Sequence, residues 1–192
     1  MKEYALNPFF PEARYKSAYA VPYEKLYAAG IRGVIFDIDN TLVPPDAPAD
    51  ERSRELFRRL GEIGLRTCLV SNNRAPRIAP LAAALGTQFV GKALKPRKYG
   101  YLRAMEIMGT EPESTISVGD QIFTDIWGAN RIGMHTALVE PMERREEPQI
   151  VLKRILELPV LFLYALEKRR GHLPDPCWVR GGAGAGRSRD GS

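Results

Sequence analysis

The chain is poor in the residues that build disulfide frameworks and histidine-based metal sites. It contains two cysteines and two histidines in 192 residues. Cys68 and Cys177 are 109 positions apart and show no metal-ligand or redox spacing, so we expect two free thiols in a reducing compartment, the cytoplasm. His135 and His172 have no evident carboxylate or cysteine partner in the sequence, which favours ordinary structural roles for both.

Long apolar runs are also missing. No segment approaches the roughly 20 apolar residues of a membrane span. Residues 1–20 contain Glu3 and Glu12 and no continuous apolar stretch, so we expect neither a secretory signal nor a transit peptide there. The glycines of residues 181–192 follow no strand and precede no helix, which argues against a phosphate-binding loop. Their low complexity indicates disorder.

Positive charge is in modest excess. The chain has 28 basic and 23 acidic residues, a net charge of +5. This balance suits an anionic partner, such as a phosphorylated substrate, an acidic membrane surface or nucleic acid. Because no nucleic-acid-binding motif accompanies the basic residues, we expect no nucleic-acid partner.

One stretch, residues 34–41, joins an apolar strand to two carboxylates and a hydroxyl. Val34, Ile35 and Phe36 are β-formers, and Asp37, Asp39 and Thr41 follow them directly. Ligands bind at the carboxyl ends of strands in open α/β sheets. A strand followed by a plain acidic turn is the alternative, because aspartate and asparagine are common in turns.

The same arrangement recurs three times along the chain. Ser71 and Asn72 follow a strand over 66–70, Lys95 follows a strand over 88–90, and Asp120 and Asp125 follow a strand over 115–118. Helices over 50–63, 75–85, 98–109 and 123–132, with a final strand over 136–139, complete an alternating pattern. The pattern predicts an α/β fold, a three-layer, Rossmann-like, doubly wound parallel sheet. The predicted division is an irregular N-terminal arm (1–30), a catalytic core (31–145), a C-terminal helical segment (146–170) and a Pro/Gly-rich disordered tail (171–192).

Taken in order, these motifs resemble those of the haloacid dehalogenase superfamily of phosphoryl-transfer enzymes. The match is strand-Asp-x-Asp-x-Thr, strand-Ser, Lys, and strand-Gly-Asp-x4-Asp over residues 32–140. In detail it is similar to subfamily IIIA, the YqeG-like branch related to mitochondrial-type phosphatidylglycerophosphate phosphatases. The resemblance implies a phosphatase with an aspartyl-phosphate intermediate.

The resemblance also implies roles for the carboxylates. Asp37 is the expected nucleophile, and Asp39 the acid that protonates the leaving alcohol and later activates water. Asp37 and Asp120 are expected to hold Mg²⁺ together with the carbonyl oxygen of Asp39. Asp125 is either a further ligand, a hydrogen-bond partner of one, or a plain acid at a helix start.

The remaining site residues are cationic or hydrogen-bond donors. Lys95 is expected to neutralise phosphate charge and to orient the nucleophile. The hydroxyl groups of Thr41 and Ser71, with the backbone amides of Ile38 and Asn72, are expected to bind phosphate oxygens.

The short spacing between motifs leaves no room for an inserted cap domain. Only 29 residues separate Thr41 from Ser71, and 23 separate Ser71 from Lys95. As the resemblance implies, capless members act on large or externally presented substrates, so a lipid head group is the most specific expectation, with phosphatidylglycerophosphate as substrate. A soluble sugar or nucleotide phosphatase, or a binding or assembly protein on the same fold, are the alternatives.

Residues 149–166 form a second helical region, rich in apolar residues and interrupted by Pro159. One interpretation is a helix that covers a face of the sheet. The other is peripheral contact with the inner face of a membrane, because Lys168, Arg169 and Arg170 follow the apolar stretch.

Overall fold

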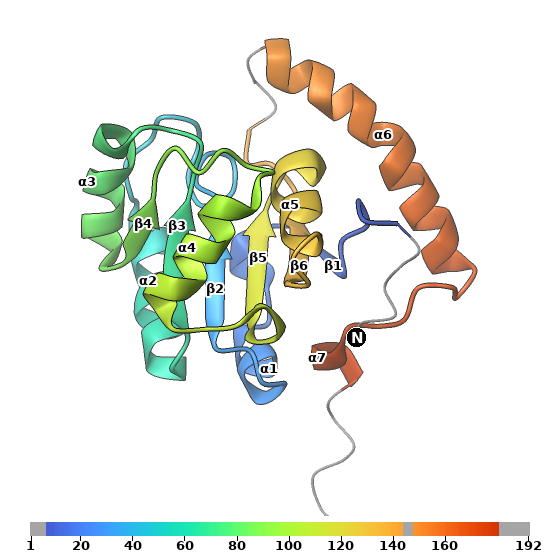
Figure 1. Ribbon diagram of the computed structural model, residues 1–192, viewed down its shortest axis with the longest axis horizontal. Helices are drawn as coiled ribbons and strands as arrows, with labels where there is room; N and C mark the ends of the chain where they lie inside the picture. Colours follow the sequence, from blue (N-terminus) through green and yellow to red (C-terminus); the bar gives the residue numbers. More distant parts are fainter. Residues whose placement is uncertain (1–6, 144–147, 181–192) are drawn as a thin grey trace, which may run out of the picture.

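The centre of the protein is a six-stranded sheet. The computed structural model describes residues 7–143 and 148–180 (Figure 1). All strand pairs are parallel, in the order β1-β6-β5-β2-β3-β4. This confirms the predicted doubly wound α/β sheet. The strands are β1 (Ala13–Tyr15), β2 (Gly33–Phe36), β3 (Arg66–Val70), β4 (Gln88–Val90), β5 (Thr115–Gly119) and β6 (His135–Val139).

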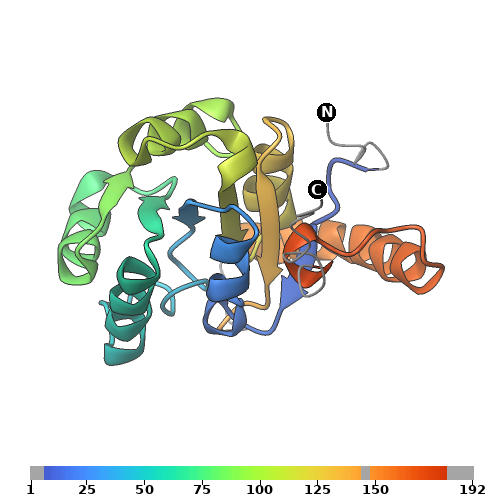
Figure 2. The ribbon, with the colours of Figure 1, turned by 90° about the horizontal axis from the view of Figure 1, so that it is seen from below.

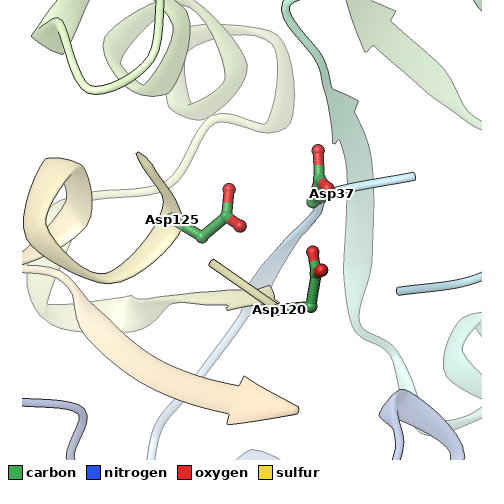
Figure 3. Close-up of side chains that lie close together, drawn as sticks. All are labelled: Asp37, Asp120 and Asp125. Carbon is green, nitrogen blue, oxygen red and sulfur yellow. The ribbon is translucent and has the colours of Figure 1, made fainter. Parts of the chain in front are cut away.

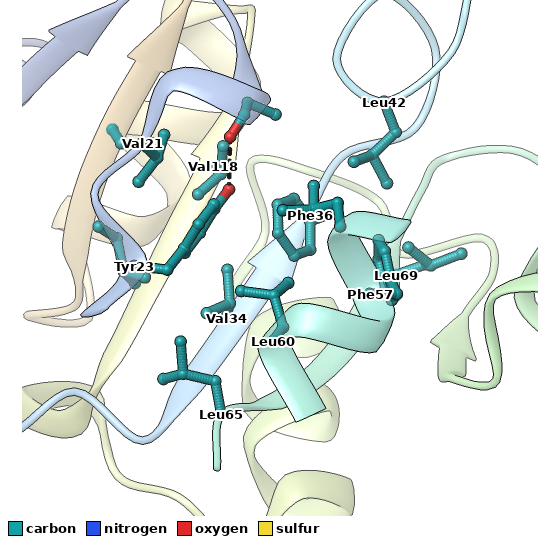
Figure 4. Close-up of a cluster of buried hydrophobic side chains, with 14 of the residues drawn as sticks. Val21, Tyr23, Val34, Phe36, Leu42, Phe57, Leu60, Leu65, Leu69 and Val118 are labelled. Atoms are coloured by element: carbon teal, nitrogen blue, oxygen red, sulfur yellow. Dashed lines mark hydrogen bonds between the residues drawn. The ribbon is translucent and has the colours of Figure 1, made fainter. Parts of the chain in front are cut away.

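Helices cover both faces of the sheet (Figure 2). On one face lie α1 (Tyr23–Ala28), α2 (Glu51–Ile63) and α3 (Ala75–Leu85), and on the other α4 (Lys98–Met108) and α5 (Trp127–Asn130). Side chains alternate along β2, so Val34 and Phe36 enter the first core while Ile35 enters the second. Figure 4 shows the first core, where Phe36 packs against Phe57 at a ring-centroid distance of 5.2 Å.

The helix predicted over 123–132 has a different form. Residues Ile122–Ile126 make a π-helical turn before α5 begins. The N–H of Ile126 donates to the carbonyl of Gln121, five residues back, at 3.4 Å. A π turn inserts one extra residue, a device found at functional sites. Here it includes Asp125, whose carboxylate turns back to accept from the Gln121 N–H at 3.1 Å.

The expectation of an irregular N-terminal arm is wrong for the described residues. β1 extends the sheet by pairing with β6, with Ala13 opposite Ala137 and Tyr15 opposite Val139. α1 then buries Tyr23 and Leu26 completely. A strand edge with unpaired backbone groups accepts such an addition, and the pairing cannot be read from a three-residue segment of sequence.

The tail prediction is also wrong for the part that is described. After Gly171 the chain returns to the core and forms α7 (Cys177–Arg180). Trp178 is only 1% exposed, and its indole N–H donates to the Tyr15 hydroxyl at 3.0 Å. His135 lies against Trp178 and pairs with Glu12 at 2.6 Å. Residues 181–192, predicted to be disordered, lie outside the described residues.

A single helix, α6 (Pro148–Arg169), runs along the β1 side of the molecule and continues through Pro159 (Figure 1). Glu157 and Tyr164 on its inner side are buried. In the described part of the chain, no helix is long and apolar enough to cross a membrane. The outer side exposes large apolar residues: Leu152, Ile155, Leu156, Leu158, Phe162 and Leu163.

Candidate active site

The chain reverses sharply after β2. Asn40 adopts a left-handed conformation with φ 63°, which asparagine tolerates better than most residues. The N–H groups of Thr41 and Leu42 both bond to the carbonyl of Ile38, at 3.2 and 2.9 Å. After this tight turn the Thr41 hydroxyl reaches the Asp120 carboxylate, whereas the Asp39 carboxylate bonds to Asn73 and Arg77.

Three carboxylates converge at the carboxyl edge of the sheet (Figure 3). One oxygen each of Asp37, Asp120 and Asp125 lies within 4.8 Å of the others. They come from the ends of β2 and β5 and from the π turn. Lys95 joins them, with its ammonium 2.5 Å from Asp37 and 2.6 Å from Asp125. The structure therefore brings together four of the residues that the motifs predict.

Burial makes it unfavourable for all three carboxylates of this cluster to be ionised at once, and this is reflected in the pKa values of Asp37 and Asp120. Burial raises the pKa of Asp37 to about 8; Lys95 opposes this shift, whereas Asp125 and Asp120 add to it. Burial, with Asp125, raises the pKa of Asp120 to about 6. Burial alone would lower the pKa of Lys95, but Asp125 and Asp37 outweigh it and raise that pKa.

A divalent cation would offset this unfavourable charge. The three converging carboxylates supply the oxygen ligands that Mg²⁺ prefers, and their formal negative charge exceeds the positive charge of the two cations beside them, Lys95 and Arg154. The donor set therefore fits a hard cation held by Asp37, Asp120 and Asp125. When bound there, such an ion would polarise a phosphoryl group.

The absence of a side chain at Gly119 leaves the space that the Asp125 side chain occupies. A β-carbon at position 119 would lie 2.4 to 2.5 Å from atoms of the Asp125 side chain. Real β-carbons do not approach other atoms this closely, so only glycine allows the carboxylate to lie against the end of β5.

Asp39 lies apart from the three-carboxylate cluster. Its oxygens accept from Asn73 Nδ2 at 2.8 Å and from Arg77 at 2.9 Å, and its side chain is 28% exposed. Its accessible position is suitable for proton exchange with a leaving group or water. Metal binding through its carbonyl oxygen stays a prediction. The sequence motifs do not include Arg77, which lies in the first turn of α3, the helix that follows Ser71.

The predicted phosphate-binding residues have varied partners. Thr41 donates to Asp120 at 3.1 Å, so its hydroxyl orients a carboxylate. Ser71 is 4% exposed, and its oxygen accepts from the N–H of Asn73 at 3.1 Å. The Asn72 side chain accepts from the Lys95 N–H at 2.7 Å and donates to the Lys95 carbonyl at 3.3 Å. Asn72 therefore fixes the backbone of the cationic residue.

α6 adds two contacts that the sequence motifs do not contain. Arg154 pairs with the buried Asp120 carboxylate and donates to the Asp120 carbonyl. Glu157 accepts from the Ile122 N–H at 2.7 Å, next to the π turn. Burial raises the pKa of Glu157. Only an Arg-x-x-Glu spacing within the helical region hinted at a shared inner face.

Comparison with known proteins identifies the fold family. A model of haloacid dehalogenase-like hydrolases matches residues 46–133. The protein "Probable phosphatase YqeG" of Bacillus subtilis is 36% identical over 86% of this chain and 95% of its own length. The chain belongs to the haloacid dehalogenase-like hydrolases. It is a phosphatase, a phosphoric monoester hydrolase, as the motif order predicted.

Two further similarities differ in extent. "Phosphatidylglycerophosphate phosphatase 1, chloroplastic/mitochondrial" of Arabidopsis thaliana is 32% identical over 79% of this chain. The chain spans 47% of that relative's length. The structure of NagD from Escherichia coli K-12 superimposes with a TM-score of 0.49 and 15% identity, over 63% of this chain and 91% of NagD.

Proposed function

We propose that the protein is a Mg²⁺-dependent phosphatase that acts on phosphatidylglycerophosphate through an aspartyl-phosphate on Asp37. The observation that carries the chemistry is the position of Asp37. It ends a buried strand, faces two further carboxylates, and is paired with Lys95 at 2.5 Å. This arrangement supports a nucleophilic role for Asp37, because a cationic group and carboxylates that suit a cation lie beside it.

The proposed reaction has two steps. In the first, a carboxylate oxygen of Asp37 attacks phosphorus, the bond from phosphorus to the ester oxygen breaks, and Asp39 gives its proton to the leaving alcohol. In the second, Asp39 takes a proton from water, the water oxygen attacks phosphorus, and the bond to Asp37 breaks. Inorganic phosphate leaves, and both aspartates return to their starting states. Lys95 and Ser71 bind phosphate oxygens in both steps.

The lipid substrate is supported by α6. Leu152, Ile155 and Leu156 are 60%, 55% and 56% exposed and lie within one turn of Arg154, which contacts Asp120. Between Thr41 and Ser71 the chain forms only α2 and β3, and between Ser71 and Lys95 only α3 and β4, so neither of these two intervals holds an inserted domain. An open site beside an apolar helix face suits a head group presented by a bilayer. The proposed location is cytoplasmic, at the inner face of a membrane.

The test is phosphate release from a panel of substrates with and without Mg²⁺. The panel holds phosphatidylglycerophosphate in mixed micelles beside soluble glycerol, sugar and nucleotide phosphates. We expect kcat/KM to favour the lipid by orders of magnitude and Asp37→Asn to be inactive on every ester. Preference for a soluble ester would remove the lipid assignment and keep the mechanism. Activity retained by Asp37→Asn would remove the mechanism.

A further inference from the structure

A hollow lies between the end of β1 and the C-terminal half of α6. Its volume is about 450 Å³, and the catalytic carboxylates do not line it. Four basic residues, Arg14, Lys16, Lys168 and Arg169, line it, against one acidic residue, Glu140. The ring of Tyr164 forms another part of the wall, with the Lys168 ammonium 6.0 Å from its centre. The hollow is therefore a positively charged site with an aromatic wall.

Strand register places this hollow on the same edge of the sheet as the catalytic carboxylates. Tyr15, which lines it, pairs with Val139, and Leu138 pairs with Gly119, the residue before Asp120. β1 lies two strands from β5, a spacing of about 10 Å. A surface that presents a substrate to the active site can therefore also reach the hollow.

An apolar strip continues from the hollow along α6. Leu158, Phe162, Ala165 and Arg169 follow one another at spacings of three and four residues, so they share one side of the helix. Ala165 and Arg169 line the hollow, whereas Leu158 and Phe162 are 60% and 70% exposed. A basic hollow thus opens directly onto exposed apolar surface.

We propose that the hollow binds the head group of an anionic phospholipid in a bilayer, with the strip of Leu158 and Phe162 against the adjoining acyl region. The four basic side chains complement a phosphate, and the strip complements the apolar part of the same molecule. A free phosphate ion would contact the basic side chains alone and leave the apolar strip without a partner. The inference rests on the proposed function in one respect, because the bound lipid belongs to the surface that carries the proposed substrate.

The first test is co-sedimentation of the full chain with phosphatidylcholine vesicles that contain or lack phosphatidylglycerol. We expect Lys168→Glu/Arg169→Glu to weaken binding to the anionic vesicles about 20-fold or more. The matched control is Lys25→Glu/Arg54→Glu, which makes the same change in net charge at exposed positions of α1 and α2. It should stay within a few-fold of the wild type. Equal losses in the two variants would contradict the proposal, as would wild-type protein that ignores phosphatidylglycerol.

The second test separates the apolar strip from general surface hydrophobicity. Phe162→Ser should weaken vesicle binding about tenfold. Leu102→Ser, at a 50% exposed position on α4, should leave binding unchanged. An unchanged Phe162→Ser variant, or a wild-type dimer in solution that Phe162→Ser converts to monomer, would assign the strip another role.

Four outcomes separate this inference from a plain anion site and from the proposed function. Millimolar inorganic phosphate that displaces the protein from vesicles would mark the hollow as a plain anion site and overturn the lipid proposal. Turnover of a soluble aryl phosphate should be unchanged in Lys168→Glu/Arg169→Glu, and a large loss would show that the hollow belongs to catalysis. Wild-type protein that binds vesicles but does not hydrolyse phosphatidylglycerophosphate supports this inference and overturns the proposed substrate. Hydrolysis in micelles without vesicle binding does the reverse.

Discussion

Arg154 of α6 holds Asp120 at two points, the carboxylate and the backbone carbonyl. The same helix reaches the π turn through Glu157 and the N–H of Ile122. α6, which lies outside the sheet, therefore holds both Asp120 and Ile122, the two ends of the short segment that leads from Asp120 toward Asp125. We infer that Arg154 is a positioning residue for the carboxylate cluster.

Replacing Arg154 tests this role. Arg154→Ala should lower kcat on a soluble phosphate ester by about 10- to 100-fold, because partners that orient metal ligands have effects of this size. Arg154→Lys keeps the positive charge but cannot contact the Asp120 carboxylate and carbonyl together as a guanidinium does. Its kcat should therefore lie between those of the wild type and Arg154→Ala. Steady-state rates measured across Mg²⁺ concentrations provide the readout. Arg170→Ala, an exposed arginine on the turn after α6, is the control. Wild-type kcat in Arg154→Ala would refute the role.

The role of Asp39 predicts a dependence on the leaving group. Asp39→Asn should slow the first step, measured as alcohol release in a single turnover, about 10²- to 10⁴-fold on glycerol phosphate, whose alkoxide needs a proton, and much less on 4-nitrophenyl phosphate. Asp46→Asn is a close control, because Asp46 also pairs with Arg77, at 3.1 Å, yet its side chain is 91% exposed. Equal losses of Asp39→Asn on both esters would argue against general acid catalysis by Asp39.

The contact between Gly119 and Asp125 predicts a cost for the smallest possible side chain. Gly119→Ala should destabilise the fold by about 1–3 kcal/mol, since a β-carbon there overlaps the Asp125 side chain. Gly61→Ala in α2 meets no atom within 4 Å and should stabilise the protein by about 0.5–1 kcal/mol. Urea unfolding of both variants measures the difference. Equal shifts in the two would show that the Asp125 contact is loose.

Metal binding should depend on pH in a defined direction. The pKa values of Asp37 (about 8) and Asp120 (about 6) are raised, so these two groups hold more protons in the folded metal-free protein than in the unfolded chain between about pH 4 and 8. Their contribution to the stability of the metal-free protein should therefore fall as pH rises through that window, most clearly above about pH 5, where carboxyl groups with lowered pKa values no longer titrate. Added Mg²⁺ competes with these protons, so its affinity should rise over the same range. Calorimetric melting at several pH values, with Mg²⁺ or with EDTA, checks both slopes. If the melting temperature of the metal-free protein rose from pH 5 to 8, the raised pKa values of Asp37 and Asp120 would be contradicted.

The buried Trp178 predicts that α7 belongs to the folded unit. Trp178→Ala should cost about 3–5 kcal/mol, because it removes a large, fully buried side chain. Its neighbour Val179 is 54% exposed, so Val179→Ala should change stability by less than about 0.5 kcal/mol. Thermal unfolding of both variants is the measurement. If Trp178→Ala lowered the free energy of unfolding only slightly, residues 171–180 would not be part of the folded unit.

Much of the catalytic core could be predicted because its signals are local. The strands 66–70 and 88–90 and the helix 75–85 occur at the predicted residues, since each is a short apolar or periodic segment bounded by turn residues. Parallel strands bring their carboxyl ends to one edge, so the polar residues that follow them had to meet there. This is why the motif order alone groups Asp37, Lys95, Asp120 and Asp125.

Residue order and periodicity thus determined five of the six described strands, the order of the motifs and the meeting of Asp37, Lys95, Asp120 and Asp125. Tertiary structure alone decided which partners those side chains took. Asp39 turned to Arg77, Thr41 to Asp120, and α6 delivered Arg154 from outside the sheet. β1 and the Trp178 helix likewise joined the core through long-range contacts. Such contacts depend on where distant surfaces come together, and a local pattern carries no record of that.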